Sequence, residues 1–275
     1  MTPLTVGSLF SPSGGDIIEK LTVLDLFSGI GGFSLGLQRT GGFETIAFCE
    51  IDPFCRKVLA KHWPGVPCFE DITKLDKEEL DSLGRVDVIC GGFPCQDISC
   101  AGKGAGIHAE RSGLWWEMLR IIRLVRPRFV LVENVAALLN RGLDEVLGSL
   151  AESGYDARWQ ILRACDFGLP HRRERLYLIA NCESLRRATL LDGMGKKAKQ
   201  RRYSESPGSF WGYEPALCVC APGYTYPRLA RLDREDNGIP DRVDRLRALG
   251  NAIVPQCAQF VGQCLLDSIE MGAAQ

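Results

Sequence analysis

The fold depends most on the stretch Val86-Asp87-Val88-Ile89-Cys90-Gly91-Gly92-Phe93-Pro94-Cys95-Gln96-Asp97-Ile98-Ser99. Its apolar start predicts a buried β-strand that ends at two glycines. Loops at the carboxyl ends of strands face the ligand crevice of an open α/β sheet, where Cys95 would serve as a nucleophile. The alternative is that Cys95 is a small buried hydrophobe, as an average cysteine is. The Pro-Cys pair and the glycine-rich stretch 101–106 favour the nucleophile.

Strand-like and helix-like patterns alternate on both sides of this stretch. Strands are expected at 22–27, 44–50, 67–69, 129–132, 155–162 and 176–180, and helices from the glycine turn to Gln38 and at 53–62, 114–125 and 143–153. Such alternation predicts an α/β fold with a doubly wound, mostly parallel sheet of the Rossmann-like type. The ligand site is expected at the carboxyl ends of its strands.

The alternation stops at Cys182, and three regions follow from this. Residues 1–181 are expected to form the main domain, 182–240 a small irregular lobe, and 241–275 a helical segment that returns to the main domain. Residues 183–202 carry seven Lys or Arg against two acids, although the whole chain has a net charge of −1. A basic run is more often a solvated face than a binding site, so it suggests nucleic acid only weakly.

Composition narrows the class of protein. With 275 residues, 45% of them hydrophobic, the chain reads as an ordinary globular protein without a transmembrane segment or signal peptide. Its twelve scattered cysteines indicate a reduced, intracellular chain and not a disulfide framework. No metal site is expected, because Cys218 and Cys220 lack a partner pair and the histidines are only His62, His108 and His171.

A nucleoside pocket is indicated by the first three strands. A glycine turn (28–34) follows the first strand, and Glu50 ends the second, about twenty residues after Gly31. This spacing is typical of an acid that binds ribose hydroxyls. Asp71, after the third strand, is placed to bind an adenine amino group. The dinucleotide fingerprint is incomplete, because Ser34 stands where a third glycine belongs.

Three kinds of reactive side chain converge at the later strand ends. Cys95 supplies a thiolate, Glu133 leaves the next strand, and Arg173 and Arg175 precede the last one. An acid on a ring nitrogen, an arginine on the neighbouring carbonyl and a thiolate on a ring carbon would activate an electron-poor pyrimidine. Burial would raise the pKa of Glu133 and favour its protonated form. The alternative for either charged residue alone is a surface ion pair.

Five motifs in order resemble the cytosine-5 DNA methyltransferase family of the bacterial and phage type. They are Asp25–Phe33, Gly91–Ser99, Glu133-Asn134-Val135, Arg173-Glu174-Arg175 and Gly250–Val254, and the resemblance spans residues 22–266. It implies a methyltransferase fold that uses S-adenosyl-L-methionine and releases S-adenosyl-L-homocysteine. It also implies that the lobe at 182–240 recognises the target sequence.

The resemblance assigns a role to each catalytic residue. Cys95 would attack carbon 6 of a flipped cytosine, and the methyl group would go to carbon 5. Glu133 would bind ring nitrogen 3 and the amino group, Arg175 the 2-oxo group, and Arg173 would support the catalytic loop. The cofactor pocket would be lined by Phe27, Ser28, Gly29, Ile30, Gly31, Gly32, Glu50, Ile51, Asp71, Ile72, Pro94, Asn251 and Ala252. The loop 96–113 would close over the site as a lid.

The implied partner is double-stranded DNA, with a cognate restriction endonuclease as a second partner, and a monomer is expected. No membrane partner is expected, and the protein would act on DNA in the cytoplasm of a bacterial or phage-infected host cell. Two features depart from the family pattern. His171 stands where the family has Gln, and a late motif is degenerate at 228–245. The small lobe suggests a short or loosely read target site.

Two other functions stay open. One is an RNA (tRNA) cytosine-5 methyltransferase of the same fold, against which the wording of residues 96–99 counts. The other is a DNA-binding relative that does not catalyse, against which the intact Cys95, Glu133 and Arg175 count.

Overall fold

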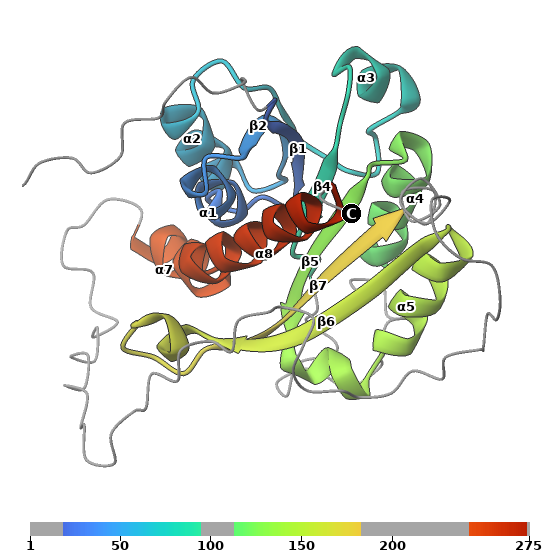
Figure 1. Cartoon of the computed structure of the whole chain (residues 1–275). Coiled ribbons are helices and arrows are strands. Elements are labelled where there is room, and N and C mark those ends of the chain that lie inside the picture. The colour runs from blue at the N-terminus through green and yellow to red at the C-terminus, as the bar shows by residue number, and fades with distance from the viewer. Residues whose placement is uncertain (1–18, 95–112, 183–241, 274–275) are drawn as a thin grey trace, which may run out of the picture.

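The computed structural model describes residues 19–94, 113–182 and 242–273, and its centre is a seven-stranded sheet in the order β3-β2-β1-β4-β5-β7-β6 (Figure 1). The strands are β1 (Leu21–Leu26), β2 (Phe43–Cys49), β3 (Cys68–Phe69), β4 (Val88–Gly91), β5 (Phe129–Val135), β6 (Tyr155–Arg163) and β7 (Glu174–Cys182). The pairs from β3 to β5 are all parallel, whereas β7 runs antiparallel to both of its neighbours. The prediction of a mostly parallel α/β sheet is confirmed.

Helices cover both faces of the sheet. They are α1 (Gly32–Arg39), α2 (Pro53–His62), α3 (Lys77–Ser82), α4 (Leu114–Val125), α5 (Leu143–Glu152), α7 (Arg242–Asn251) and α8 (Pro255–Ala273), with 3-10 turns η2 (Ala136–Asn140) and η3 (Ala164–Phe167). One apolar core includes buried residues of α1 and α8, and the other includes those of α3, α4 and α5. Along β4, Val88 and Cys90 face the first core and Ile89 the second. A strand buried on both faces needs apolar residues throughout, as this one has.

The last two strands depart from the predicted alternation of strands and helices. Between β6 and β7 the chain makes only the short turn η3. A parallel crossover needs a dozen or more residues, usually with a helix, so β7 turns back antiparallel and lies between β5 and β6. The amino end of β7 therefore lies beside the carboxyl end of β5, with Val135 opposite Arg175 and Glu133 opposite Tyr177.

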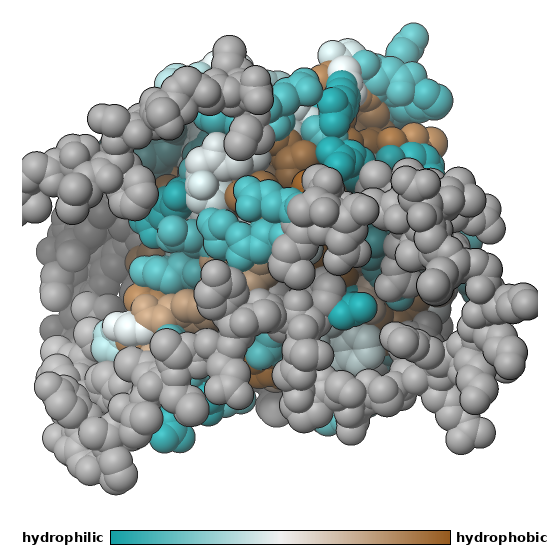
Figure 2. Space-filling view, viewed as in Figure 1, coloured by the Kyte–Doolittle hydropathy of each residue, from teal (hydrophilic) through white to brown (hydrophobic). Residues whose placement is uncertain are grey.

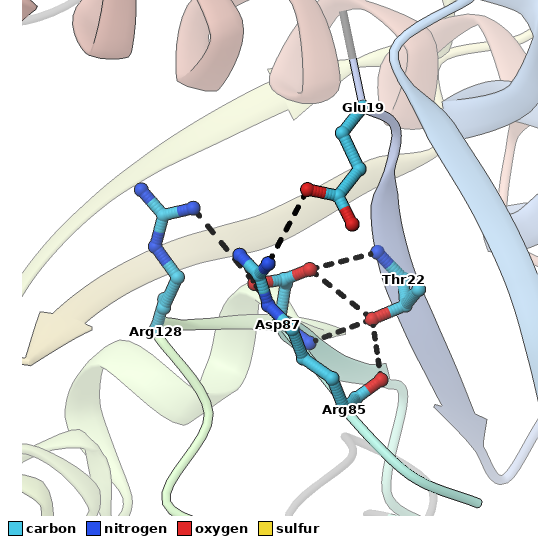
Figure 3. Close-up of polar contacts among 5 residues, drawn as sticks. All are labelled: Glu19, Thr22, Arg85, Asp87 and Arg128. Atoms are coloured by element: carbon cyan, nitrogen blue, oxygen red, sulfur yellow. Dashed lines mark hydrogen bonds and ion pairs between the residues drawn. The ribbon is translucent and has the colours of Figure 1, made fainter.

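At the other end of the strands, Asp87 connects the amino ends of β1, β4 and β5 (Figure 3). Its buried carboxylate accepts hydrogen bonds from the Thr22 amide and hydroxyl at 3.2 and 3.1 Å. Arg85 Nε donates to it at 2.9 Å, and Arg128 Nη1 lies 3.8 Å away. Glu19 adds an ion pair to Arg85 at 3.5 Å. Because a buried charge needs partners, this network accounts for the one acid inside the apolar run.

The short helix α3 is absent from the prediction. It begins with a capping box, in which the Asp76 carboxylate accepts the Glu79 amide at 2.9 Å and Glu79 Oε2 accepts the Asp76 amide at 3.3 Å. An Asp-x-x-Glu pattern is a recognised sign of a helix start. The helix could therefore have been found from the sequence.

The C-terminal segment packs closely on the first helix. A side chain at Gly32 would collide with the carbonyl of Ile253, and one at Gly36 with the carbonyl of Pro255. Only glycine lets the two backbones approach this far. As a result, α8 covers α1 and completes one apolar core of the sheet (Figure 1).

Several predicted features lie outside the described residues. These are Cys95, the lid 96–113 apart from Gly113, and the lobe 182–240 with its basic run, apart from Cys182. On the face shown in Figure 2, the described surface mixes hydrophilic side chains with small hydrophobic patches. Within the ranges that the structure describes, no helix is long and apolar enough to span a bilayer.

Candidate active site

The glycine turn after β1 holds the first part of the site. Gly29 and Gly31 have φ values of 54° and 83°, which glycine adopts without strain, and Phe27 shares this backbone region with a φ of 52°. A side chain at Gly31 would lie 2.6 Å from the Trp63 ring. The Ser28 hydroxyl donates to the Asp25 carbonyl at 2.5 Å, which fixes the turn to β1. The turn is therefore tight and presents mainly backbone atoms.

Ser34 compensates for the missing third glycine of the fingerprint. Its hydroxyl and amide donate to Asp25 Oδ2 at 2.7 and 3.3 Å. Burial raises the pKa of Asp25 to about 7, although the hydrogen bonds from Ser34 oppose that shift. The first turn of α1 is therefore attached to the end of β1 by a side chain that the dinucleotide pattern does not contain.

Glu50 stands directly after β2, beside the glycine turn. Its two carboxylate oxygens accept the amides of Gly29 at 2.7 Å and Asp52 at 2.8 Å. The neighbouring Ile51 is 71% exposed, the highest exposure among the large apolar side chains described. A fixed carboxylate beside an uncovered apolar side chain suits the ribose and base of a nucleoside.

The loop after β3 supplies the next predicted pair. Asp71 Oδ1 accepts the amide and hydroxyl of Thr73 at 3.0 and 2.7 Å, and these hydrogen bonds lower the pKa of Asp71. Ile72 is buried beneath it. Ile51, Phe69 and Asp71 share a hollow of about 570 Å³. Ile51 after β2 and Asp71 after β3 therefore line one concave surface.

The residues that lead to Cys95 are held from two sides. Phe93 is buried, and its ring lies 5.4 Å from that of Trp115 between centroids. The Asn134 amide donates to the Phe93 carbonyl at 3.2 Å, while its own oxygen accepts the Val135 amide at 2.8 Å. Pro94 is the last described residue before Cys95. Asn134 belongs to a sequence motif but is not among the predicted site residues, although it joins β5 to this loop.

Glu133 and Arg175 form a pair across the two reversed strands. Arg175 Nε lies 3.0 Å from Glu133 Oε1, and the Glu133 side chain is 8% exposed. Burial raises the pKa of Glu133 to about 7, against the opposing charges of Arg175 and Arg173. Among the described residues, no donor makes a well-directed hydrogen bond to Oε1. The sequence predicts a strand at 129–132 with Glu133-Asn134-Val135 at its end, and β5 includes these three residues.

Arg173 contacts the C-terminal segment of the chain. Its Nη1 donates to the Gly250 carbonyl at 2.5 Å, at the end of α7. The expected support for the catalytic loop falls on residues outside the described ranges. The contact places Asn251 and Ala252 next to the arginine motif. Ile253 then reaches Gly92, where an added side chain would lie 3.4 Å from its Cδ1 and 2.9 Å from Glu133 Oε2.

Two arginines that the sequence did not single out hold the region around Glu50. Arg56 Nη1 donates to the Ile51 carbonyl at 3.1 Å, and its Nη2 lies 3.1 Å from Glu70. Arg247 of α7 lies 2.6 Å from Asp52. An arginine on a helix looks like a solvated residue in sequence, so no pattern marks these contacts.

Two further points of the sequence analysis concern His171 and a metal site. His171 is exposed on the loop before β7. Within the residues that the structure describes, no group of three His, Cys, Asp or Glu side chains is placed to hold a metal ion.

Comparison with known proteins identifies the family. A model of the family described as C-5 cytosine-specific DNA methylase matches residues 21–211. Type II methyltransferase M2.BsuMI of Bacillus subtilis (strain 168) is 41% identical over 169 residues, which cover 58% of this chain and 42% of the relative. Type II methyltransferase M.HpaII of Haemophilus parainfluenzae is 37% identical over 184 residues, covering 64% of this chain and 51% of the relative. The chain thus spans about half or less of the length of these relatives.

A solved structure supports the fold. The S. pombe Dnmt2 methyltransferase superposes with a TM-score of 0.51 at 24% identity, over 60% of this chain and 51% of that one. This likeness concerns the fold alone. The family model covers well over half of the sequence, from the start of β1 past the end of β7. The chain belongs to the C-5 cytosine-specific DNA methylase family.

Proposed function

We propose that this protein transfers a methyl group from S-adenosyl-L-methionine to carbon 5 of a cytosine in DNA. The observation that carries the proposal is the ion pair of the buried Glu133 with the part-buried Arg175, in which Glu133 lies beside Gly92 on the path to Cys95. An acid with a pKa near 7 and a guanidinium side by side match the ring nitrogen and carbonyl of one cytosine edge. Two Type II methyltransferases among the relatives support the assignment.

The residues of the proposed cofactor site suit S-adenosyl-L-methionine. Glu50 would bind the ribose hydroxyls, Ile51 would cover one face of the adenine, and Asp71 would accept the adenine amino group. The tight turn at Gly29 and Gly31 lets the rest of the cofactor approach the backbone. S-adenosyl-L-methionine supplies an electrophilic methyl group when bound.

Each of the chain's own groups then has one task in the reaction. The Cys95 thiolate forms a bond to carbon 6 of the cytosine, while protonated Glu133 donates to ring nitrogen 3 and Arg175 donates to the 2-oxo group. The electron pair displaced by this attack makes carbon 5 nucleophilic. Methylation of carbon 5 leaves S-adenosyl-L-homocysteine. Solvent water then takes the proton from carbon 5, and the electron pair of that C–H bond forms the double bond between carbons 5 and 6 while Cys95 leaves as the thiolate, which restores the aromatic ring.

The remaining assignments concern partners. We assign the reading of the DNA sequence to the lobe 182–240, and we expect a monomer that acts on double-stranded DNA inside the cell. The relatives named as Type II methyltransferases make a cognate restriction endonuclease the expected second partner.

The test is methylation of mixed-sequence double-stranded DNA with labelled cofactor, followed by bisulfite sequencing, with tRNA in a parallel reaction. We expect label at carbon 5 of cytosines within a defined DNA site. The Cys95→Ser variant is the matched control, since it should lose methyl transfer but keep cofactor binding. Label in tRNA alone would replace the proposal with the RNA alternative. Cofactor binding without transfer to either nucleic acid would favour a non-catalytic DNA-binding relative.

A further inference from the structure

Arg120, in the middle of α4, donates three side-chain hydrogen bonds. Two go to a loop far from it in sequence, and one goes to a residue of its own helix. Its Nη1 donates to the Leu75 carbonyl at 2.9 Å and its Nη2 to the Ile72 carbonyl at 2.7 Å. Its Nε donates to Glu117 at 2.8 Å, which holds the guanidinium in place along the helix. Two carbonyls of one loop are therefore bonded to the two ends of one rigid, planar fork.

This loop carries Asp71, whose own side chain is bonded only within the loop, to Thr73 and Lys74. It leaves β3, which has only two residues and forms the edge of the sheet. Ile72 and Leu75 are 5% and 1% exposed, so apolar burial fixes its inner side. That burial leaves the orientation of the backbone around Asp71 to the partners of its carbonyls. Buried carbonyls need donors, and Arg120 supplies one to each, beside the Leu75 amide that the Ile72 carbonyl accepts at 3.3 Å.

The geometry points to Arg120 as a positioning residue for the adenine end of the cofactor site. We infer that it acts through the Ile72 and Leu75 carbonyls, and so sets where the Asp71 carboxylate meets the adenine amino group. The inference rests on the proposed function and adds to it a residue that lies outside the predicted pocket. Arg56 has a comparable contact to the Ile51 carbonyl, which shows that this protein also fixes the neighbouring loop by an arginine.

The test compares two ligands by calorimetry. S-adenosyl-L-homocysteine carries the adenine amino group, and its deaminated analogue S-inosyl-L-homocysteine lacks it. For Arg120→Ala we expect the Kd of S-adenosyl-L-homocysteine to rise about tenfold, and that of the inosyl analogue less than about threefold. The Michaelis constant for S-adenosyl-L-methionine should rise with the former, while kcat at saturation changes less than about twofold.

The matched control is Arg123→Ala on the same helix. Arg123 also bonds to a loop, donating from Nε to the Ser153 hydroxyl at 2.9 Å, but that loop lies away from the cofactor residues. It should leave both Kd values unchanged. Arg120→Lys keeps the charge but cannot span both carbonyls, so its Kd should lie between those of wild type and Arg120→Ala. It also serves if the alanine variant does not fold.

Three results would overturn the inference. Equal weakening of both ligands by Arg120→Ala would mean that it acts on the whole fold. Unchanged Kd values in both Arg120 variants would mean that the loop needs no such support. A wild-type protein that binds neither ligand would remove the proposed function itself, and the inference with it.

Discussion

Replacing Glu133 with Gln should change how stability depends on pH. The pKa of Glu133 is raised from its ordinary 4.5 to about 7 by burial, so folding favours its protonated form. The raised pKa means that the stability is fully present below pH 4.5 and is lost as the pH rises through 7. Linkage between these two pKa values gives a loss of about 2.5 kcal/mol from about pH 5 to about pH 8. The glutamine side chain of the Glu133→Gln variant is neutral throughout, so the variant should not show that loss.

The measurement is urea unfolding of wild type and Glu133→Gln, without ligands, at several values across this pH range. The difference in unfolding free energy between the two proteins should change by the amount given above, with the variant favoured at high pH. Asp25→Asn is a parallel case, because burial also raises the pKa of Asp25 to about 7. If wild type and Glu133→Gln lost stability in parallel as the pH rose, Glu133 would be ionised in the folded protein at low pH, and its role as a protonated donor would be refuted.

Other substitutions test the cofactor site, the packing and the lobe. Glu50→Ala should weaken binding of S-adenosyl-L-homocysteine by about 1.5–3 kcal/mol, since a charged hydrogen bond to the ribose is lost; an unchanged Kd in calorimetry would exclude that contact. Gly36→Ala should lower the melting temperature because its methyl group would collide with the Pro255 carbonyl. In Gly148→Ala the added methyl group meets open space on α5, so this variant should instead gain about 0.5–1 kcal/mol in its free energy of unfolding. Equal changes in the stability of the two variants would contradict the packing of α8 on α1. Neutralising the basic run 196–202 should flatten the dependence of log affinity on log salt and leave the methylated site unchanged. A shifted site in bisulfite sequencing would show that the run reads bases.

The parts of the fold that follow from local pattern could be predicted from the sequence. β4 is apolar throughout because both of its faces are buried, and Gly29 and Gly31 of the tight turn predicted after β1 have positive φ values. The reversal of β7 could not be found in this way. It depends on the length and shape of the connection through η3, and a strand has the same apolar pattern in either direction.

The candidate site shows the same limit. Glu133 and Arg175 could be named because their residue types match one edge of a pyrimidine, yet only the register of β5 and β7 brings them within 3.0 Å. Asn134, Arg56 and Arg120 hold backbone carbonyls of the site, and such contacts leave no periodic signal in sequence. The apparent defect at Ser34 has a physical explanation only once Asp25 is seen to accept its hydroxyl.

The close packing of α8 on α1 has a consequence for how proteins of this kind can diverge. β7 ends at Cys182 and α7 begins at Arg242, so the intervening chain is a connection whose two ends belong to described elements of the fold. The entropy lost in closing such a connection grows only with the logarithm of its length, and doubling it costs about 0.6 kcal/mol. The core therefore places almost no limit on the size of the insert. If this connection is the DNA-reading lobe that we propose, it can be lengthened, shortened or exchanged between proteins while the helices that cover the sheet stay as they are.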